Sequence, residues 1–144
     1  MAFNIIKDKV PPILFDKRLV ELRIESAIAG LGAHEAQGRM QKIVQEIITA
    51  GNVILYIPQI DMLAKTSEGG MLNVVDTVLP VLREGLFPVV GTTIPQAYKK
   101  YIEPRGDFTS IFDVINVVEI SEEEALTYLT YYAMSLEKQY NVIV

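Results

Sequence analysis

The sequence has 144 residues, half of them apolar, and a formal net charge of −5 at neutral pH. This length suits one domain with a sizeable core, and the composition is far too apolar for a disordered chain. The acidic balance argues against a nucleic-acid partner, and no apolar run approaches the roughly 20 residues that span a bilayer. The absence of cysteine excludes disulfides and cysteine metal sites, and the single histidine disfavours a histidine-rich metal site; a cytoplasmic location is expected.

Apolar periodicity predicts strands that alternate with helices in chain order. Apolar runs of strand length predict strands at residues 17–24, 52–58, 86–93 and 114–120. Helical spacing predicts helices at residues 35–50, 71–84 and 95–102, with a last helix that begins after Ser121. Polar stretches at residues 65–70 and 103–110 are predicted to be loops. This order is typical of a mostly parallel sheet covered by helices.

Several residues predict how these helices begin, bend and end. Gly51 and Gly85 are placed to end helices, and Pro80 predicts a kink in the helix at 71–84. Ser121 and Glu124 have the spacing of a capping box. The last helix is expected to bury a stripe formed by Ala125, Leu129, Tyr132 and Leu136.

Four stretches in collinear order resemble the first ATPase module of Clp-type AAA+ protein unfoldases. They are "VPPILFDKRLVELRIESAIAG" from residue 10, "NVILYIPQID" from residue 52, "TVLPVLREGLFPVVGTTIPQAYKKYIE" from residue 77 and "FDVINVVEISEEEALTYL" from residue 112. No single motif is decisive, but the run of four covers nearly the whole chain. The resemblance implies an α/β fold of three layers with a mostly parallel sheet of about four strands, like the AAA+ large subdomain.

The family's catalytic positions carry other residues in this chain. The resemblance places the family's magnesium-binding aspartate at Pro58 and its water-polarising glutamate at Gln59, and neither residue has a carboxylate. Its paired arginines fall on Ser110 and Ile111, and the loss of an arginine finger alone costs about 10³ to 10⁵ in rate. The phosphate-binding "GxxxxGK[ST]" motif does not occur. ATP and magnesium are the family's cofactors, and none is expected for this chain.

Thr93 stands where the family has a polar sensor at the end of its third strand. The resemblance therefore marks Thr93 as the one candidate cofactor-binding residue. A threonine at a strand end also commonly makes a local cap or turn hydrogen bond. Both interpretations are open from the sequence.

We therefore predict a single AAA+-like domain over residues 1–144, without the phosphate loop and without the family's C-terminal lid. Its predicted role is structural: a degenerate, non-hydrolysing core that packs against protein partners, as a homo-oligomer or within a larger chaperone or protease-associated ATPase. One alternative is part of an active ATP-dependent unfoldase whose ATP-binding loop lies outside this chain. A second alternative is a free-standing α/β protein-interaction domain.

The Clp-like fold places the strand that leads into the phosphate loop between the strands at 86–93 and 114–120, and this chain lacks it. Each buried backbone group left unpaired by the empty position costs about 1–3 kcal/mol. We therefore expect the flanking strands to close up, or "AFNII" or "YNVIV" to insert, with dimerisation through the remaining apolar surface. Donation of a strand by a second copy is the third possibility. Bare edges at Val89–Val90 and Val117–Val118 would count against this expectation and against the resemblance.

Overall fold

The computed structural model describes residues 2–68 and 72–141. The chain divides into two compact units, Met1–Phe112 and Asp113–Val144, and each is described by itself. The first unit holds the sheet and most of the helices, and the second holds one long helix. The single domain predicted over residues 1–144 stays a prediction.

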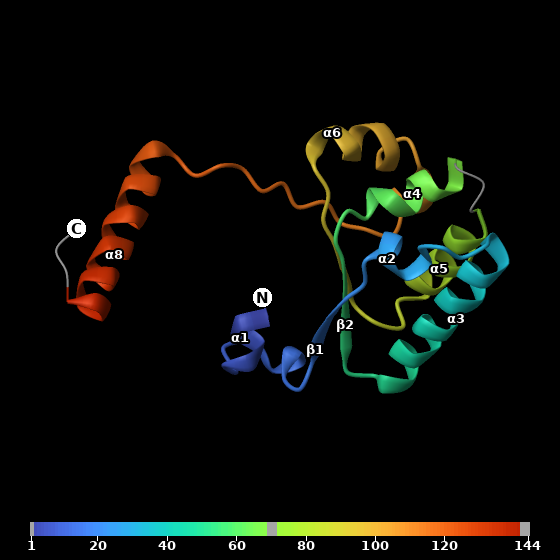
Figure 1. The fold of residues 1–144 in the computed structure, drawn as a ribbon, viewed down its shortest axis with the longest axis horizontal. Helices are drawn as coiled ribbons and strands as arrows, with labels where there is room; N and C mark the ends of the chain where they lie inside the picture. Colours follow the sequence, from blue (N-terminus) through green and yellow to red (C-terminus); the bar gives the residue numbers. More distant parts are fainter. Residues whose placement is uncertain (1, 69–71, 142–144) are drawn as a thin grey trace. The chain divides into compact units, whose positions relative to one another are not determined.

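Three parallel strands form the sheet of the first unit (Figure 1). They are β1 (Arg18–Glu21), β2 (Val53–Ile57) and β3 (Val89–Gly91), in the order β1-β2-β3. β2 is central and almost wholly buried, as its solidly apolar sequence predicts. The predicted α/β fold with a parallel sheet is confirmed, with three strands in the described residues where about four were expected.

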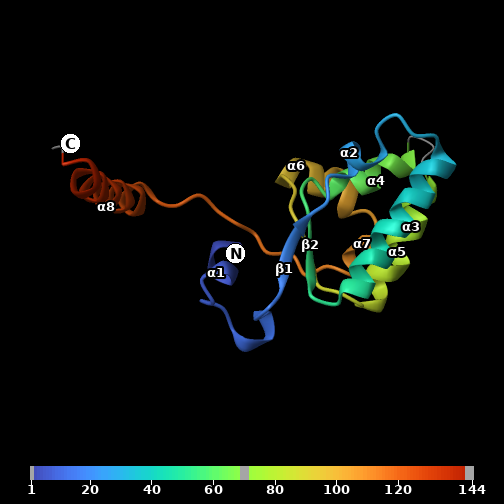
Figure 2. The same cartoon turned by 60° about the horizontal axis from the view of Figure 1, so that its bottom comes forward.

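Two long helices cover one face of this sheet. α3 (Ala33–Ala50) and α5 (Leu72–Glu84) lie side by side in both views (Figures 1 and 2). Their apolar faces pack with Leu55 and Ile57 of β2 into a single core. Both predicted helix ends are confirmed, because Gly51 and Gly85 adopt the left-handed backbone that ends a helix without a steric penalty.

Shorter helices connect these elements. They are α1 (Ala2–Ile6), η1 (Pro12–Leu14), α2 (Ile24–Ile28), α4 (Asp61–Glu68), α6 (Pro95–Ala97), η2 (Tyr98–Ile102) and α7 (Gly106–Thr109). The loop predicted at 65–70 is wrong up to residue 68, and the loop predicted at 103–110 contains α7. The first predicted strand is too long, because Ile24 turns into the core as the first residue of α2.

The outer edge of β3 is bare, because β3 pairs only with β2 among the described residues. The expectation that flanking strands close up is therefore wrong for these residues. Insertion of "AFNII" is also wrong, because these residues form α1 instead of a strand. The last three residues of "YNVIV" lie outside the described residues, and its Tyr140 ends α8 (Glu122–Tyr140).

The second unit contains residues 114–120 and α8. The capping box is confirmed: Glu124 N donates to Ser121 Oγ at 3.2 Å, and Ser121 N donates to Glu124 Oε2 at 3.0 Å. The strand predicted at 114–120 is wrong, since these residues form no strand, and the predicted buried stripe is wrong, since no residue of α8 is buried. A strand needs a neighbouring strand to pair with, and a buried stripe needs an apolar surface to cover it. Strand propensity and helix periodicity in the segment itself do not identify either partner.

Candidate functional site at the carboxyl end of β2

β2 ends at Ile57, and Pro58 and Gln59 follow directly at the carboxyl edge of the sheet. In open parallel sheets this edge is where ligand sites are built. Pro58 lies just beyond the strand, so its missing N–H removes no bond from the ladder. Gln59 has a positive φ of 52°, which is uncommon for a residue with a side chain and marks a tight turn.

This turn is held against the end of β3. Thr92 N donates to Ile57 O at 3.1 Å, and Ile60 N donates to Thr92 O at 3.0 Å. A Cβ placed on Gly91 would lie 2.6 Å from Ile60 Cδ1, so glycine is what allows the turn to pack so closely on β3. The backbone positions of Pro58 and Gln59 are therefore fixed by both neighbouring elements.

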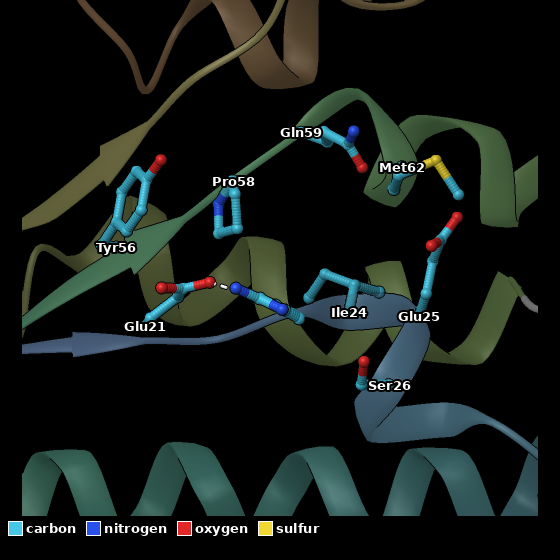
Figure 3. Close-up of a pocket in the computed structure, with 9 residues that line it drawn as sticks. Glu21, Ile24, Glu25, Ser26, Tyr56, Pro58, Gln59 and Met62 are labelled. Carbon is cyan, nitrogen blue, oxygen red and sulfur yellow. Dashed lines mark hydrogen bonds and ion pairs between the residues drawn. The ribbon is translucent and has the colours of Figure 1, made fainter.

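A cleft of about 540 Å³ opens beside Pro58 and Gln59 (Figure 3). It is lined by Glu21, Arg23, Ile24, Glu25, Ser26, Tyr56, Pro58, Gln59 and Met62. Figure 3 shows Glu21 on the side of Pro58 and Glu25 opposite Met62. Glu21 forms an ion pair with Arg23. Tyr56 and Thr92 hydroxyls are 3.2 Å apart. The cleft thus combines acidic, basic and apolar walls.

Asp61, two residues after Gln59, is a buried carboxylate with both oxygens engaged. Lys65 Nζ lies 2.6 Å from Asp61 Oδ2, and Thr93 Oγ1 donates to Asp61 Oδ1 at 2.7 Å. Asp61 is 4% exposed, and it is the one charged or polar residue that is buried in the described part of the chain. Lys65 also lies 4.7 Å from the centre of the Tyr101 ring, a cation–π contact.

These contacts keep the pair charged. Burial acts to raise the pKa of the Asp61 carboxyl, but hydrogen bonds from Lys65 and Thr93 outweigh it and hold that pKa below its ordinary value. The hydrogen bond to Asp61 raises the pKa of Lys65. Asp61 is therefore a carboxylate at neutral pH, and its oxygens accept hydrogen bonds from within the fold.

The structure brings some of the predicted site residues together and separates others. Pro58 and Gln59 line the cleft, and Thr93 lies against Asp61 on the adjacent strand end. Ser110 and Ile111 follow α7 and do not line the cleft; Ser110 Oγ donates to Asp107 O at 3.3 Å, and Ile111 is half-buried against the core.

Sequence reasoning missed the cluster of Asp61, Lys65 and Tyr101. Its signal was available in part, because Asp61 and Lys65 are four residues apart, the spacing at which opposite charges meet on a helix. Residues 65–70 were interpreted as a loop, and that concealed the spacing. Tyr101 is distant in sequence, and no pattern links it to Lys65.

The described residues contain neither a metal-binding cluster nor a membrane-spanning helix. Within residues 2–68 and 72–141, no group of three or more histidine, aspartate or glutamate side chains has the geometry to hold a metal ion. No helix in these two ranges has the length and apolarity to cross a membrane.

Known proteins match this chain along nearly its whole length. It is 35% identical over 145 residues to the chaperone protein ClpB of Helicobacter hepaticus, a match that covers 99% of this chain and 17% of that protein. It is 32% identical over 131 residues to the Bacillus subtilis negative regulator of genetic competence ClpC/MecB, covering 90% of this chain and 16% of that protein. No family model matches the chain.

Solved structures of Hsp104 share the fold. A closed-state cryo-EM structure of Hsp104 with ATPγS and FITC casein matches with a TM-score of 0.77 and 26% identity, covering 98% of this chain and 24% of that chain. The ADP complex of S. cerevisiae Hsp104 matches with a TM-score of 0.73. This chain therefore spans less than a quarter of the length of each of these proteins. In sequence and in fold, it is a Clp-type AAA+ segment.

Proposed function

We propose that this chain is a packing module of a Clp-type AAA+ assembly and that it supplies no hydrolytic carboxylate at the end of β2. The observation that carries the proposal is the pair Pro58–Gln59, which stands at the carboxyl edge of the central strand, beside the cleft. Neither side chain can bind magnesium as an anion or accept a proton from water. The module would contribute surfaces to protein partners, in the cytoplasm.

The residues near this edge do not fit a magnesium–nucleotide site. Magnesium favours carboxylate and phosphate oxygens. Asp61, the carboxylate nearest in sequence to Gln59, already accepts from Lys65 and Thr93, so a metal would have to displace a buried ion pair. Thr93 as a nucleotide sensor stays a proposal, and its hydrogen bond to Asp61 supports the structural role more directly.

A phosphate-release assay on the 144-residue chain tests the proposal. We expect no turnover above background with millimolar Mg-ATP at high protein concentration. We also expect no rise in melting temperature, because a ligand raises it only by binding the folded state, and this chain should not bind Mg-ATP. Turnover that persists through further purification, and that Asp61→Asn abolishes, would contradict the proposal and point to Asp61 as an unexpected catalytic group.

A second function, part of an active ATP-dependent unfoldase, is favoured by one specific observation. The chain spans only 17% of the Helicobacter hepaticus ClpB, so a phosphate loop supplied by other sequence is compatible with the match. This alternative requires hydrolysis without carboxylates at Pro58 and Gln59. The two functions therefore differ in whether the chain supports ATP hydrolysis once a phosphate loop is supplied.

A further inference from the structure

We propose that the cleft beside Pro58 and Gln59 holds a basic side chain, arginine or lysine, of a protein partner. The inference rests on the proposed function in one respect, since it takes this chain to offer surfaces to other proteins. It goes further because it names the surface, the group that this surface receives and the residues that receive it. It does not involve nucleotide.

The cleft is built entirely within the first unit. All of its lining residues lie between the end of β1 and the start of α4. The turn after β2 and the start of α4 form one side, and the start of α2 forms the other (Figure 3). Its volume of about 540 Å³ falls in the range of roughly 300–1,000 Å³ that is usual for ligand sites. The cleft is therefore large enough for one long side chain together with some of the backbone that carries it.

Glu25 supplies a carboxylate that the fold leaves without a close cation. The other acid of the lining, Glu21, forms an ion pair with Arg23, and each offsets the charge of the other. No ion pair or hydrogen bond joins the Glu25 carboxylate to a residue of the described ranges. Lys65 acts on it only from beyond ion-pair distance and is already paired with Asp61. The lining therefore carries one net negative charge, which a cationic group would compensate.

Apolar side chains border this carboxylate. Met62 lies opposite Glu25 (Figure 3), and Ile24 and Pro58 also line the cleft. Lysine and arginine have an aliphatic stem that covers apolar surface while the charged head stays at a polar group. A hydrated metal ion has no such stem. One carboxylate beside apolar walls therefore favours a basic side chain.

Two neutral polar side chains extend the site beyond the charged head. Ser26 carries a hydroxyl and Gln59 a carboxamide, and both line the cleft and are exposed. Each can donate and accept a hydrogen bond, as the peptide groups on either side of a bound side chain require. The turn that carries Gln59 is held by backbone hydrogen bonds to Thr92, so its carboxamide extends from a fixed backbone. A free amine has no peptide groups, and a polypeptide is therefore the ligand that uses the whole cleft.

Amide chemical shifts of the 144-residue chain, recorded by NMR without nucleotide, test the site. The probe is a blocked tripeptide with arginine between two alanines, and the matched neutral probe has glutamine in place of arginine. We expect the arginine peptide at millimolar concentration to shift the amides of residues 21–26 and 59–62 saturably. Butylguanidinium, which has the head and stem without peptide groups, should bind more weakly. No saturable shift, or an affinity that the glutamine peptide or butylguanidinium equals, would overturn the proposal.

Two pairs of variants assign the binding to this cleft. Glu25→Gln should weaken the affinity for the arginine peptide about tenfold, because a hydrogen bond to a charged acceptor is stronger than one to a neutral acceptor. Glu46→Gln, an exposed position of α3 outside the cleft, is the matched control and should leave the affinity unchanged.

Ser26→Lys should prevent binding, because it adds a positive charge beside Glu25. Ser26→Ala, which removes only the hydroxyl, should weaken binding much less. The amide spectrum of each variant also reports whether it is folded. An affinity that Glu25→Gln leaves unchanged, or a folded Ser26→Lys that binds as well as the wild type, would overturn the proposal, and neither result bears on ATP hydrolysis.

Discussion

Asp61 links elements that are far apart in the sequence. Its carboxylate starts α4, accepts from Thr93 beyond β3, and pairs with Lys65, which in turn lies over Tyr101 of η2. The ion pair therefore fixes the turn that carries Pro58 and Gln59. A buried charge of this kind is expensive to leave unpaired, so single substitutions should reveal its contribution.

Asp61→Asn should lower the free energy of unfolding by about 1–3 kcal/mol, the usual cost of leaving buried polar groups poorly satisfied. We expect a value below the 3–5 kcal/mol typical of fully buried pairs, because Lys65 is partly exposed and solvent can rehydrate it. Urea denaturation measures the change. The matched control is Asp76→Asn, an exposed position of α5, for which we expect a change within about 0.5 kcal/mol. Equal effects of the two substitutions would show that the ion pair does not contribute.

The contribution of Asp61 should depend on pH with a defined sign. Its pKa is lower in the folded state than in the unfolded state, so the folded state binds the proton more weakly. The stabilisation is therefore complete above the ordinary aspartate value of about 3.9 and is lost as pH falls through the folded pKa. Unfolding free energies of the wild type and Asp61→Asn should differ at pH 7, and the difference should shrink as pH falls below the ordinary aspartate value of about 3.9. A constant difference over this range would contradict the assignment.

How much the sequence could predict differs from residue to residue. Gly51, Gly85 and the Ser121–Glu124 pair were identified because local backbone chemistry decides their roles. The Asp61–Thr93 hydrogen bond joins residues 32 positions apart, and such a contact depends on how the strands are placed. Pro58 was predicted as the last residue of the strand at 52–58, and the structure places it just beyond β2; the cleft beside it was not predicted.

Pro80 lies within α5 and is exposed, while α5 continues through it to Glu84. A proline inside a helix removes one backbone hydrogen bond and crowds the preceding turn, at a cost of about 3 kcal/mol in an isolated helix. In this helix the cost is offset by packing of Val78 and Leu82 in the core.

Pro80→Ala should therefore raise the free energy of unfolding by about 1–3 kcal/mol. The matched control is Pro95→Ala, because Pro95 opens α6, where no intrahelical N–H bond is lost; its change should be within about 0.5 kcal/mol. Thermal and urea denaturation of the two variants give the comparison. A loss of stability in Pro80→Ala would contradict this prediction.

The elements that were predicted correctly are those whose partners lie nearby in the first unit. α3 and α5 show clear helical periodicity, β2 is a continuous apolar run, and the structure packs the three together. Residues 114–120 have strand composition and α8 has an apolar stripe, yet one forms no strand and the other buries no residue. Periodicity identifies a face that favours burial, but the surface that covers it is a property of the complete assembly.

The family relationship and the bare edge of β3 are both findings about this molecule. We expected bare edges to count against the resemblance, and that expectation was wrong: the edge is bare, and the chain still matches Hsp104 with a TM-score of 0.77 over 98% of its length. The sequence identity and the shared fold extend over nearly the whole segment. They do not determine the chemistry at Pro58, Gln59, Ser110 and Ile111, which only an activity measurement can assign.

Phosphate release by a fusion tests the central claim most directly. The fusion joins to this chain the part of the Helicobacter hepaticus ClpB that precedes the aligned residues, which is where the family resemblance places the phosphate loop. The matched positive control carries Pro58→Asp, Gln59→Glu, Ser110→Arg and Ile111→Arg in the same fusion. We predict no turnover above background for the unsubstituted fusion and measurable turnover for the control, since metal, water and transition-state charge then have their partners. An unsubstituted fusion that hydrolyses ATP as fast as the control would contradict the account and establish an active ATPase.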